Sequence, residues 1–251
     1  MTDLHYEVTG DGPPVVLLHQ GVVDSRVWEP QLAALAERFT VVRYDRRGFG
    51  RSPRFDGAYS PLDDLRAVLD AAGIERAALV GGSQGGKIAL DAALERPERV
   101  TALVLLCAAL GGHPIDVGTP EQEARWEAAE QAEDAAALAA IDFEIWAPLG
   151  DEDGLRARFA DNAHLNLVDD PAEPPARPAK EGLGELRVPT LVITGDRDVP
   201  AMTEIGDILE REIPGARREA LHGDHFPNLR SPDAFNRLVS DFLGTALLDP
   251  V

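Results

Sequence analysis

Residues 79–90 read LVGGSQGGKIAL, a serine flanked by paired glycines between an apolar run and a helix-like segment. Ser83 is the centre of a G-x-S-x-G pattern, which between a strand and a helix is typical of a nucleophile displayed on a sharp turn. The glycines suit that purpose because side chains two positions before and after the serine would collide in such a strained turn. The alternative is a glycine-rich structural turn in which the serine has no chemical task. The strand-to-helix context favours the nucleophile.

A serine nucleophile needs a base and an acid, expected later in the chain in the order serine, acid, histidine. Two late histidines, His222 and His225, stand in EALHGDHFPN. We favour His225 as the base because it lies beyond an expected strand end, on a loop that can hang it over the serine. The acid should follow the strand PTLVITG, where Asp196 and Asp198 occur. Asp198 is favoured because it lies on the turn beyond the strand, with Asp196 as the alternative.

The oxyanion that forms in acyl transfer needs at least two preorganised hydrogen-bond donors. One donor should be the backbone N–H of Gln84, the residue after the nucleophile. The other should come from the loop after an earlier strand, in VVLLHQGVVDSRVW, and we nominate the backbone N–H of Gly21. We interpret His19, just before that turn, as a structural side chain that fixes the loop.

The elements that must position these residues alternate between short β-branched runs and helical patterns. This alternation predicts an α/β fold with a mostly parallel, doubly wound sheet. Residues 60–73 give the clearest helix, with Ser60 as N-cap, Pro61 in the first turn and Gly73 past the end. The expected strands are Leu4–Val8, Val15–His19, Thr40–Tyr44, Ala77–Val80, Thr101–Cys107, Pro189–Thr194 and Arg217–Leu221.

The alternation stops after Cys107, and the next part of the chain shows helical patterns without a convincing strand. We therefore expect a core domain formed by residues 1–110 and 188–251. A helical cap, residues 111–187, is inserted before the penultimate strand and should lie over the C-terminal edge of the sheet. It includes a proline-rich connector at 169–180, which cannot hold a long helix.

These motifs together resemble the α/β-hydrolase fold superfamily, which includes esterases, enol-lactonases, cofactor-free haloperoxidases and C–C bond hydrolases. The resemblance rests on LLHQG, YDRRGFGRS, GGSQGG, LVITGDRD and HGDHFPNLRSPDAF, which occur in the superfamily's order. Its Gly-x-x-Asp aligns with Gly195 and Asp198, and its Gly-x-His aligns with Gly223 and His225. The resemblance thus implies the same acid and base.

Two details of the resemblance concern loops beside the serine. Gln20 occupies a position where the superfamily usually has glycine, and its side chain is expected either to crowd the oxyanion loop or to hydrogen-bond the substrate. Residues 45–52, DRRGFGRS, resemble the superfamily's D-x-R-G-x-G-x-S element. We interpret this element as mainly structural, with its charged residues bracing the neighbouring turns.

The substrate pocket is expected to be mostly apolar, with few polar groups. Gln20 and Trp28 from the core, and Phe143 and Trp146 from the end of a cap helix, are the residues we expect to line it. The sequence shows no cluster of arginine or lysine suited to a phosphorylated or polyanionic substrate. A small, neutral or moderately polar ester or lactone is the expected substrate.

Composition excludes several other classes of protein. The 44 acidic and 24 basic residues give a net charge of −20, which would repel nucleic acid and anionic membranes, so we expect neither as a partner. Cys107 is the single cysteine, which excludes an intrachain disulfide and a multi-cysteine metal site, and we expect it to be buried. The N-terminus is polar and no apolar run reaches membrane-span length, which favours a cytoplasmic protein.

The main hypothesis is a serine hydrolase that uses Ser83, His225 and Asp198, with no cofactor and no metal. Ester or lactone hydrolysis comes first, and C–C bond hydrolysis or cofactor-free perhydrolysis with the same triad is the alternative. A haloalkane dehalogenase is excluded because it would need aspartate at position 83. A further alternative is a ligand-binding or biosynthetic protein that kept the triad without ordinary hydrolysis, since fold does not fix function. The sequence predicts no oligomeric state.

Overall fold

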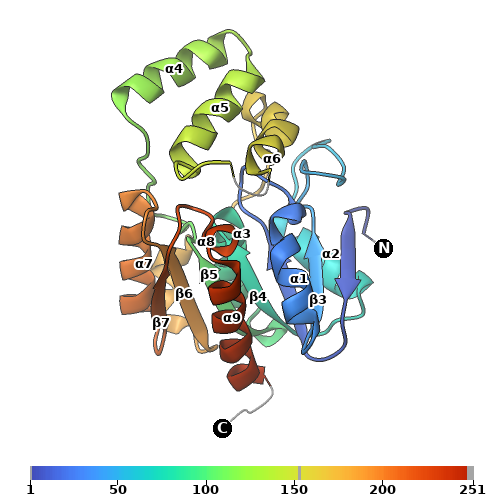
Figure 1. The fold of residues 1–251 in the computed structure, drawn as a ribbon. Helices are drawn as coiled ribbons and strands as arrows, with labels where there is room; N and C mark the ends of the chain where they lie inside the picture. Colours follow the sequence, from blue (N-terminus) through green and yellow to red (C-terminus); the bar gives the residue numbers. More distant parts are fainter. Residues whose placement is uncertain (1, 152–153, 248–251) are drawn as a thin grey trace.

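The computed structural model describes residues 2–151 and 154–247 and contains one seven-stranded sheet (Figure 1). The strands lie in the order β1-β3-β2-β4-β5-β6-β7, and every neighbouring pair is parallel except β1 and β3. The strands are β1 (Tyr6–Thr9), β2 (Pro14–Leu18), β3 (Thr40–Tyr44), β4 (Ala77–Gly82), β5 (Val100–Leu106), β6 (Thr190–Gly195) and β7 (Arg217–Leu221). The predicted α/β class is confirmed, and each predicted strand is present with small shifts of its ends.

Helices cover both faces of this sheet, as its continuously apolar central strands require. Residues of α2, α3 and α7 pack on one face, and residues of α1 and α9 pack on the other. The predicted N-cap of α2 is present: the Ser60 hydroxyl accepts the N–H of Asp63 at 3.2 Å. The core helices are α1 (Glu29–Ala36), α2 (Pro61–Ala71), α3 (Gln84–Glu95), α7 (Pro200–Glu212), α8 (Pro227–Arg230) and α9 (Pro232–Leu247).

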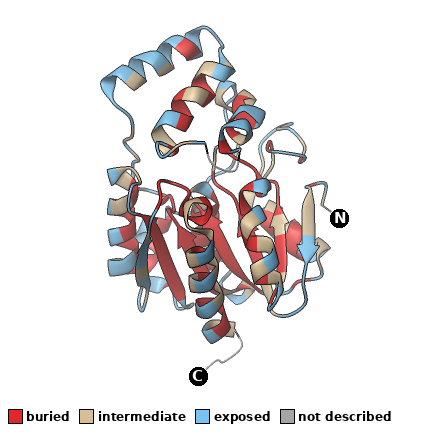
Figure 2. Cartoon of the chain, viewed as in Figure 1, coloured by how far each residue is buried: buried red, intermediate tan, exposed pale blue. Residues whose placement is uncertain are grey.

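The segment between β5 and β6 stands beyond the carboxyl ends of the strands (Figure 1). It contains α4 (Pro120–Gln131), α5 (Ala135–Trp146) and α6 (Leu155–Asn162). Glu133, whose φ is 51°, lies in the turn that separates α4 from α5. Figure 2 shows α4 as largely exposed, whereas α5 buries one side against its neighbours.

The last part of the expected cap segment packs on the core instead of over the sheet edge. Residues 179–186 form two short 3₁₀ turns, and their Ala179, Leu183 and Leu186 are buried in the core cluster that also holds α3. The chain therefore joins the body of the fold before β6 begins. Among the described residues, no helix has the length and apolar character needed to cross a bilayer.

Candidate active site

Ser83 occupies the turn between β4 and α3 with a backbone conformation that residues other than glycine rarely adopt. Its backbone has φ 49° and ψ −114°, which corresponds to a local cost of about 1–3 kcal/mol. Hydrogen bonds hold the turn in place: the Ser83 N–H donates to Leu106 at 2.9 Å, and the Ser83 carbonyl accepts from Lys87 and Ala109, each at 3.0 Å. The strained turn is thus fixed by the next strand and by the helix that follows.

The glycines around Ser83 are explained by close backbone approach. A Cβ on Gly81 would collide with the carbonyl of Gly85, and a Cβ on Gly85 would collide with the carbonyl of Leu18. A Cβ on Gly86 would lie 2.5 Å from the Cβ of Ala108, so this glycine allows α3 to approach β5. The pattern therefore has the steric origin that the sequence predicted.

His225 and Asp198 form a buried acid–base pair. Asp198 Oδ2 lies 2.9 Å and Oδ1 3.2 Å from His225 Nδ1, and the side chains are 1% and 2% exposed, respectively. Asp196 instead lies at the surface, where it accepts the N–H of Gly223 at 3.0 Å and contacts His222 at 3.3 Å. The pKa of Asp196 is lowered, mainly by the hydrogen bond from the Gly223 N–H and to a smaller extent by His222. Of the two candidate carboxylates, the histidine therefore contacts Asp198.

The loop that carries His225 is tied to the cap. Its backbone N–H lies 3.3 Å from the Trp146 carbonyl, and the ring centroids of the two residues are 4.5 Å apart. The adjacent Asp224 is fully buried, accepts two hydrogen bonds from Arg230 at 2.8 and 3.2 Å, and accepts the N–H of Leu149 at 3.2 Å. These contacts hold the imidazole in one position.

Ser83 and His225 line the same cavity, which has a volume of about 320 Å³. Within the described residues, the imidazole of His225 contacts Asp198 but makes no hydrogen bond to the Ser83 hydroxyl, and such bonds often tighten only in the complex with substrate. A larger hollow of about 390 Å³ lies between α4 and α5, and Trp146 borders both. We assign the site to the smaller cavity because it contains the reactive groups. Its walls are formed by Gly21, Val22, Arg46, Phe49, Phe55, Ser83, Gln84, Ile115, Trp146, Leu165, Asn166, Asp170 and His225.

The two nominated oxyanion donors lie side by side at this cavity. A Cβ on Gly21 would be 3.0 Å from Cγ of Gln84, so the two residues are adjacent. The N–H of Gln84 is free of any bond within its helix because Gln84 is the first residue of α3. Gly21 and Gln84 therefore lie next to each other on the wall of the cavity that contains Ser83.

His19 fixes the oxyanion loop. Its Nδ1 lies 2.8 Å from the carbonyl of Gln20, and its Nε2 accepts the N–H of Arg46 at 2.9 Å. Burial, followed by the positive charge of Arg46, lowers the pKa of His19 to about 3, so the ring is neutral with its proton on Nδ1. This matches the structural interpretation made from the sequence.

Of the four residues predicted to line the pocket, one lies on the cavity wall and three are buried elsewhere. Trp146 lies on the cavity wall, but Trp28 packs in the core on Phe235, with ring centroids 6.1 Å apart. Phe143 packs on Phe159 inside the cap at 5.5 Å, so it supports the cap and does not line the cavity. Gln20 is buried under the elbow, where its amide carbon would lie 2.7 Å from a Cβ on Gly82. The expected pocket is therefore corrected, because it is not lined by Gln20, Trp28 and Phe143.

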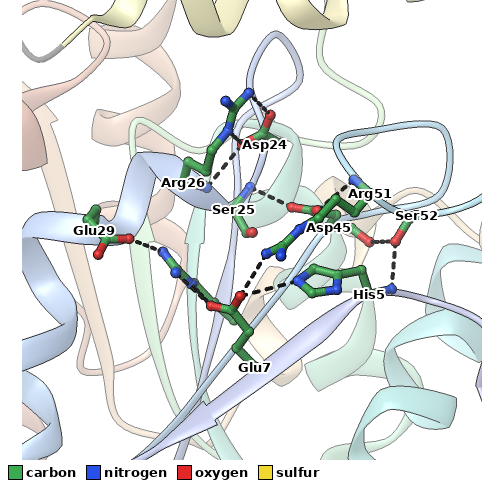
Figure 3. A network of polar contacts seen from close by, with 10 residues as sticks. His5, Glu7, Asp24, Ser25, Arg26, Glu29, Asp45, Arg51 and Ser52 are labelled. Atoms are coloured by element: carbon green, nitrogen blue, oxygen red, sulfur yellow. Dashed lines mark hydrogen bonds and ion pairs between the residues drawn. The ribbon is translucent and has the colours of Figure 1, made fainter.

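The DRRGFGRS stretch braces the loops around the site, as expected (Figure 3). Asp45 accepts the N–H of Ser25 at 3.0 Å and the N–H of Arg51 at 2.9 Å. The Ser52 hydroxyl donates to the carbonyl of Asp45 and accepts the N–H of His5, so the network reaches the residue just before β1. The element contributes rigidity, with one exception.

That exception is Arg46, whose place at the pocket was not predicted from the sequence. It lies on the cavity wall with Asn166 and Asp170, both from the part of the cap segment that follows α6. A usable signal existed, because residues that follow the carboxyl end of a central parallel strand face the ligand crevice. Arg46 is the second residue after β3.

Cys107 is buried behind the acid–base pair. Its Sγ belongs to a group with Asp198 and His225 in which the potential ligand atoms lie within 4.8 Å of one another. Burial, followed by the charge of Asp198, raises the pKa of Cys107 well above its usual range, so it is a thiol. A neutral thiol beside a carboxylate already bonded to histidine is a poor cation site.

Comparison with known proteins gives consistent matches. The sequence pattern of the α/β hydrolase fold matches residues 13–232. A relative from Azorhizobium caulinodans, named for a proposed carbamate hydrolase activity (RutD), is 31% identical over 96% of this chain and 95% of its own length. The 3-oxoadipate enol-lactonase 1 of Acinetobacter baylyi is 28% identical over 93% and 89%, respectively. The enol-lactonase structure from Burkholderia xenovorans LB400 has a TM-score of 0.78 at 29% identity and covers 96% of both chains.

Proposed function

This chain belongs to the α/β hydrolase fold family, as its motifs predicted, and we propose that it is a serine hydrolase of small carboxylic esters or lactones. The observation that carries the proposal is the buried pair of Asp198 and His225 at the wall of the cavity that also contains Ser83. That combination supplies a nucleophile, a base and an orienting acid in one place.

In the first step, the Ser83 hydroxyl attacks the acyl carbon while His225 Nε2 takes its proton. The Asp198 carboxylate accepts a hydrogen bond from Nδ1–H of His225, which fixes the tautomer and stabilises the imidazolium, and the carboxylate stays ionised. The oxyanion is held by the N–H groups of Gly21 and Gln84, where each donor contributes about 3–4 kcal/mol of transition-state stabilisation in comparable sites. The imidazolium then protonates the leaving alcohol or enol.

In the second step, water attacks the acyl-enzyme as His225 takes a proton from it. The tetrahedral intermediate collapses, the imidazolium returns the proton to Ser83, and the carboxylic acid leaves. For a lactone, both halves of the product are one molecule. Each proton that His225 accepts is returned, so the cycle needs no other group.

Ester or lactone cleavage is supported by two of the relatives. Two of the compared proteins are named as enol-lactonases and align along nearly their whole length. Trp146 and Phe49, with Ile115 and Leu165, give the cavity an apolar wall that suits the hydrocarbon part of such a substrate.

A fluorophosphonate probe and a panel of esters, lactones and vinylogous diketones test the proposal. The wild-type protein should form an adduct on Ser83 and hydrolyse an ester or lactone, and Ser83→Ala should lose both with almost unchanged thermal stability. His225→Ala should also lose the adduct and the hydrolysis. His222→Ala is the matched control and should keep both, because that histidine is 64% exposed and away from the cavity. Folded protein that forms no adduct would favour a non-hydrolytic binding protein, and turnover confined to diketones would favour C–C bond hydrolysis.

A further inference from the structure

Arg46 places a positive charge on the wall of the cavity that contains Ser83. Its backbone is fixed, because its N–H donates to His19 Nε2 at 2.9 Å. Its guanidinium lies 4.5 Å from the ring centroid of Phe49, another wall residue. The charge is therefore held at the cavity by the fold and does not depend on a mobile surface side chain.

This guanidinium lacks a carboxylate partner among the described residues 2–151 and 154–247. Its polar side-chain contact is a long one, from a terminal nitrogen to the carbonyl of Gln20 at 3.4 Å. Its Nε is buried and, within the described part of the chain, has no hydrogen-bond partner. Burial lowers the pKa of Arg46, yet arginine stays protonated in proteins. A half-buried cation whose Nε is buried and which has no carboxylate at ion-pair distance is costly, so its partner is expected from outside the fold.

The adjacent arginine shows what a structural arginine in this loop looks like. Arg47 forms two hydrogen bonds to Asp64, at 2.8 and 3.0 Å, and a third to Asp3 at 3.4 Å. The two side chains leave the strand end differently, and only Arg46 reaches the cavity. Structural bracing therefore accounts for Arg47 but not for Arg46.

One carboxylate, Asp170, also lies on the cavity wall, and it has other partners. It accepts the N–H of Ala172 at 3.0 Å and interacts with the Tyr59 hydroxyl. Its charge attracts Arg46, but the two do not approach to ion-pair distance. Asp170 therefore modulates the charge of Arg46 without neutralising it.

We propose that the cavity binds, through Arg46, a carboxylate that the substrate carries in addition to its scissile ester or lactone. This inference rests on the proposed hydrolase function and replaces the neutral substrate expected from the sequence. A guanidinium matches a carboxylate with two parallel hydrogen bonds. The volume of about 320 Å³ is small for a binding site, so the acid and the scissile group belong to one compact molecule. With a net charge of −20 around the site, a fixed local cation is needed to hold such an anion.

Two esters of equal acyl length test this inference: mono-4-nitrophenyl glutarate, which bears a carboxylate, and neutral 4-nitrophenyl pentanoate. The wild-type protein should prefer the charged ester in kcat/KM, mainly through a lower KM. Arg46→Gln should reduce that preference about tenfold to a hundredfold, the range for a hydrogen-bonded charge pair. The preference of Arg46→Lys for the charged ester should lie between those of the wild-type protein and Arg46→Gln. Asp170→Asn should increase the preference.

Arg54→Gln is the matched control, because it removes the same charge from an exposed position in the same loop. It should leave the preference within about twofold, since it acts only through screened long-range charge. Spontaneous hydrolysis, measured with Ser83→Ala, is subtracted from every rate. The inference would be overturned if Arg46→Gln lost kcat/KM equally toward both esters, or if the wild-type protein preferred the neutral ester. Either result would leave the hydrolase proposal intact.

A binding measurement separates the two proposals. Glutarate should raise the melting temperature of the wild-type protein at constant ionic strength, and it should do so less in Arg46→Gln. If Ser83→Ala retains turnover, the proposed function fails, but the glutarate shift still decides whether the carboxylate site exists. If Arg46→Gln does not fold, the wild-type ester preference and its increase in Asp170→Asn decide the question. The absence of a glutarate shift in wild-type protein would count against the site.

Discussion

Asp142 is a buried carboxyl whose replacement should change how stability depends on pH. It lies on α5 and is 7% exposed. It accepts a hydrogen bond from Asn166 at 2.8 Å and also interacts with the Trp146 side chain. Burial is the largest effect on this group and raises its pKa from 3.8 to about 6, although both hydrogen bonds act in the opposite direction.

The sign follows from proton linkage. Between pH 3.8 and about 6, the folded protein keeps the Asp142 proton while the unfolded chain loses it. The free energy of unfolding therefore falls as the pH rises through this window, and the full cost is present above about 6. The change corresponds to about 3 kcal/mol. Asp142→Asn, which resembles the protonated acid, should be more stable than the wild type at pH 7.5 by up to that amount.

Urea unfolding of both proteins between pH 4 and pH 7.5 measures the effect. Their stabilities should converge toward pH 4 and diverge toward pH 7.5, where the melting temperatures should differ by up to about 6–12 °C. Asp116→Asn, an exposed change in the loop before α4, controls for the loss of one negative charge. A difference that is constant with pH, or a variant that is less stable at pH 7.5, would refute the assignment of the cost to the buried carboxylate.

Three further results are expected. Asp198→Asn should lower turnover on the order of 10⁴-fold by disturbing the His225 tautomer, whereas Asp196→Asn should cost at most about tenfold, and comparable losses in steady-state assays would contradict the assignment of the acid. Gly85→Ala should cost about 1–3 kcal/mol in urea unfolding because its Cβ meets backbone, and a stability equal to wild type would show that the elbow can relax. Cys107 should react with a thiol reagent only after denaturation, so immediate reaction of the native protein would disprove its burial as an inert thiol.

The strands and the contact between Asp198 and His225 could be predicted because each depends on local pattern. Buried parallel strands read as apolar runs, and the loop after each strand carries the chemistry. Asp198 could be separated from Asp196 by its place beyond the strand end, and the structure puts its carboxylate on His225. Local sequence was sufficient because the turn and the strand end together fix where the side chain lies.

The pocket could not be predicted because it depends on how side chains turn at loop ends. Trp28 ends a short 3₁₀ turn that Asp24 caps by accepting an N–H at 3.1 Å, and this turn directs the ring into the core. Phe143 and Trp146 are three residues apart on α5, but one packs on α6 and the other reaches His225. Arg46 and Arg47 are alike in type and adjacent in sequence, yet of the two only Arg47 has carboxylate partners at hydrogen-bond distance.

The hydrogen bonds between the histidine loop and the cap have a consequence for protein engineering. The Trp146 carbonyl receives the N–H of His225, and the buried Asp224 receives the N–H of Leu149. Exchanging the cap for that of another protein would here also replace part of the support of the His225 imidazole. A chimera should therefore keep residues 146–149 with the core and take only the helices before them.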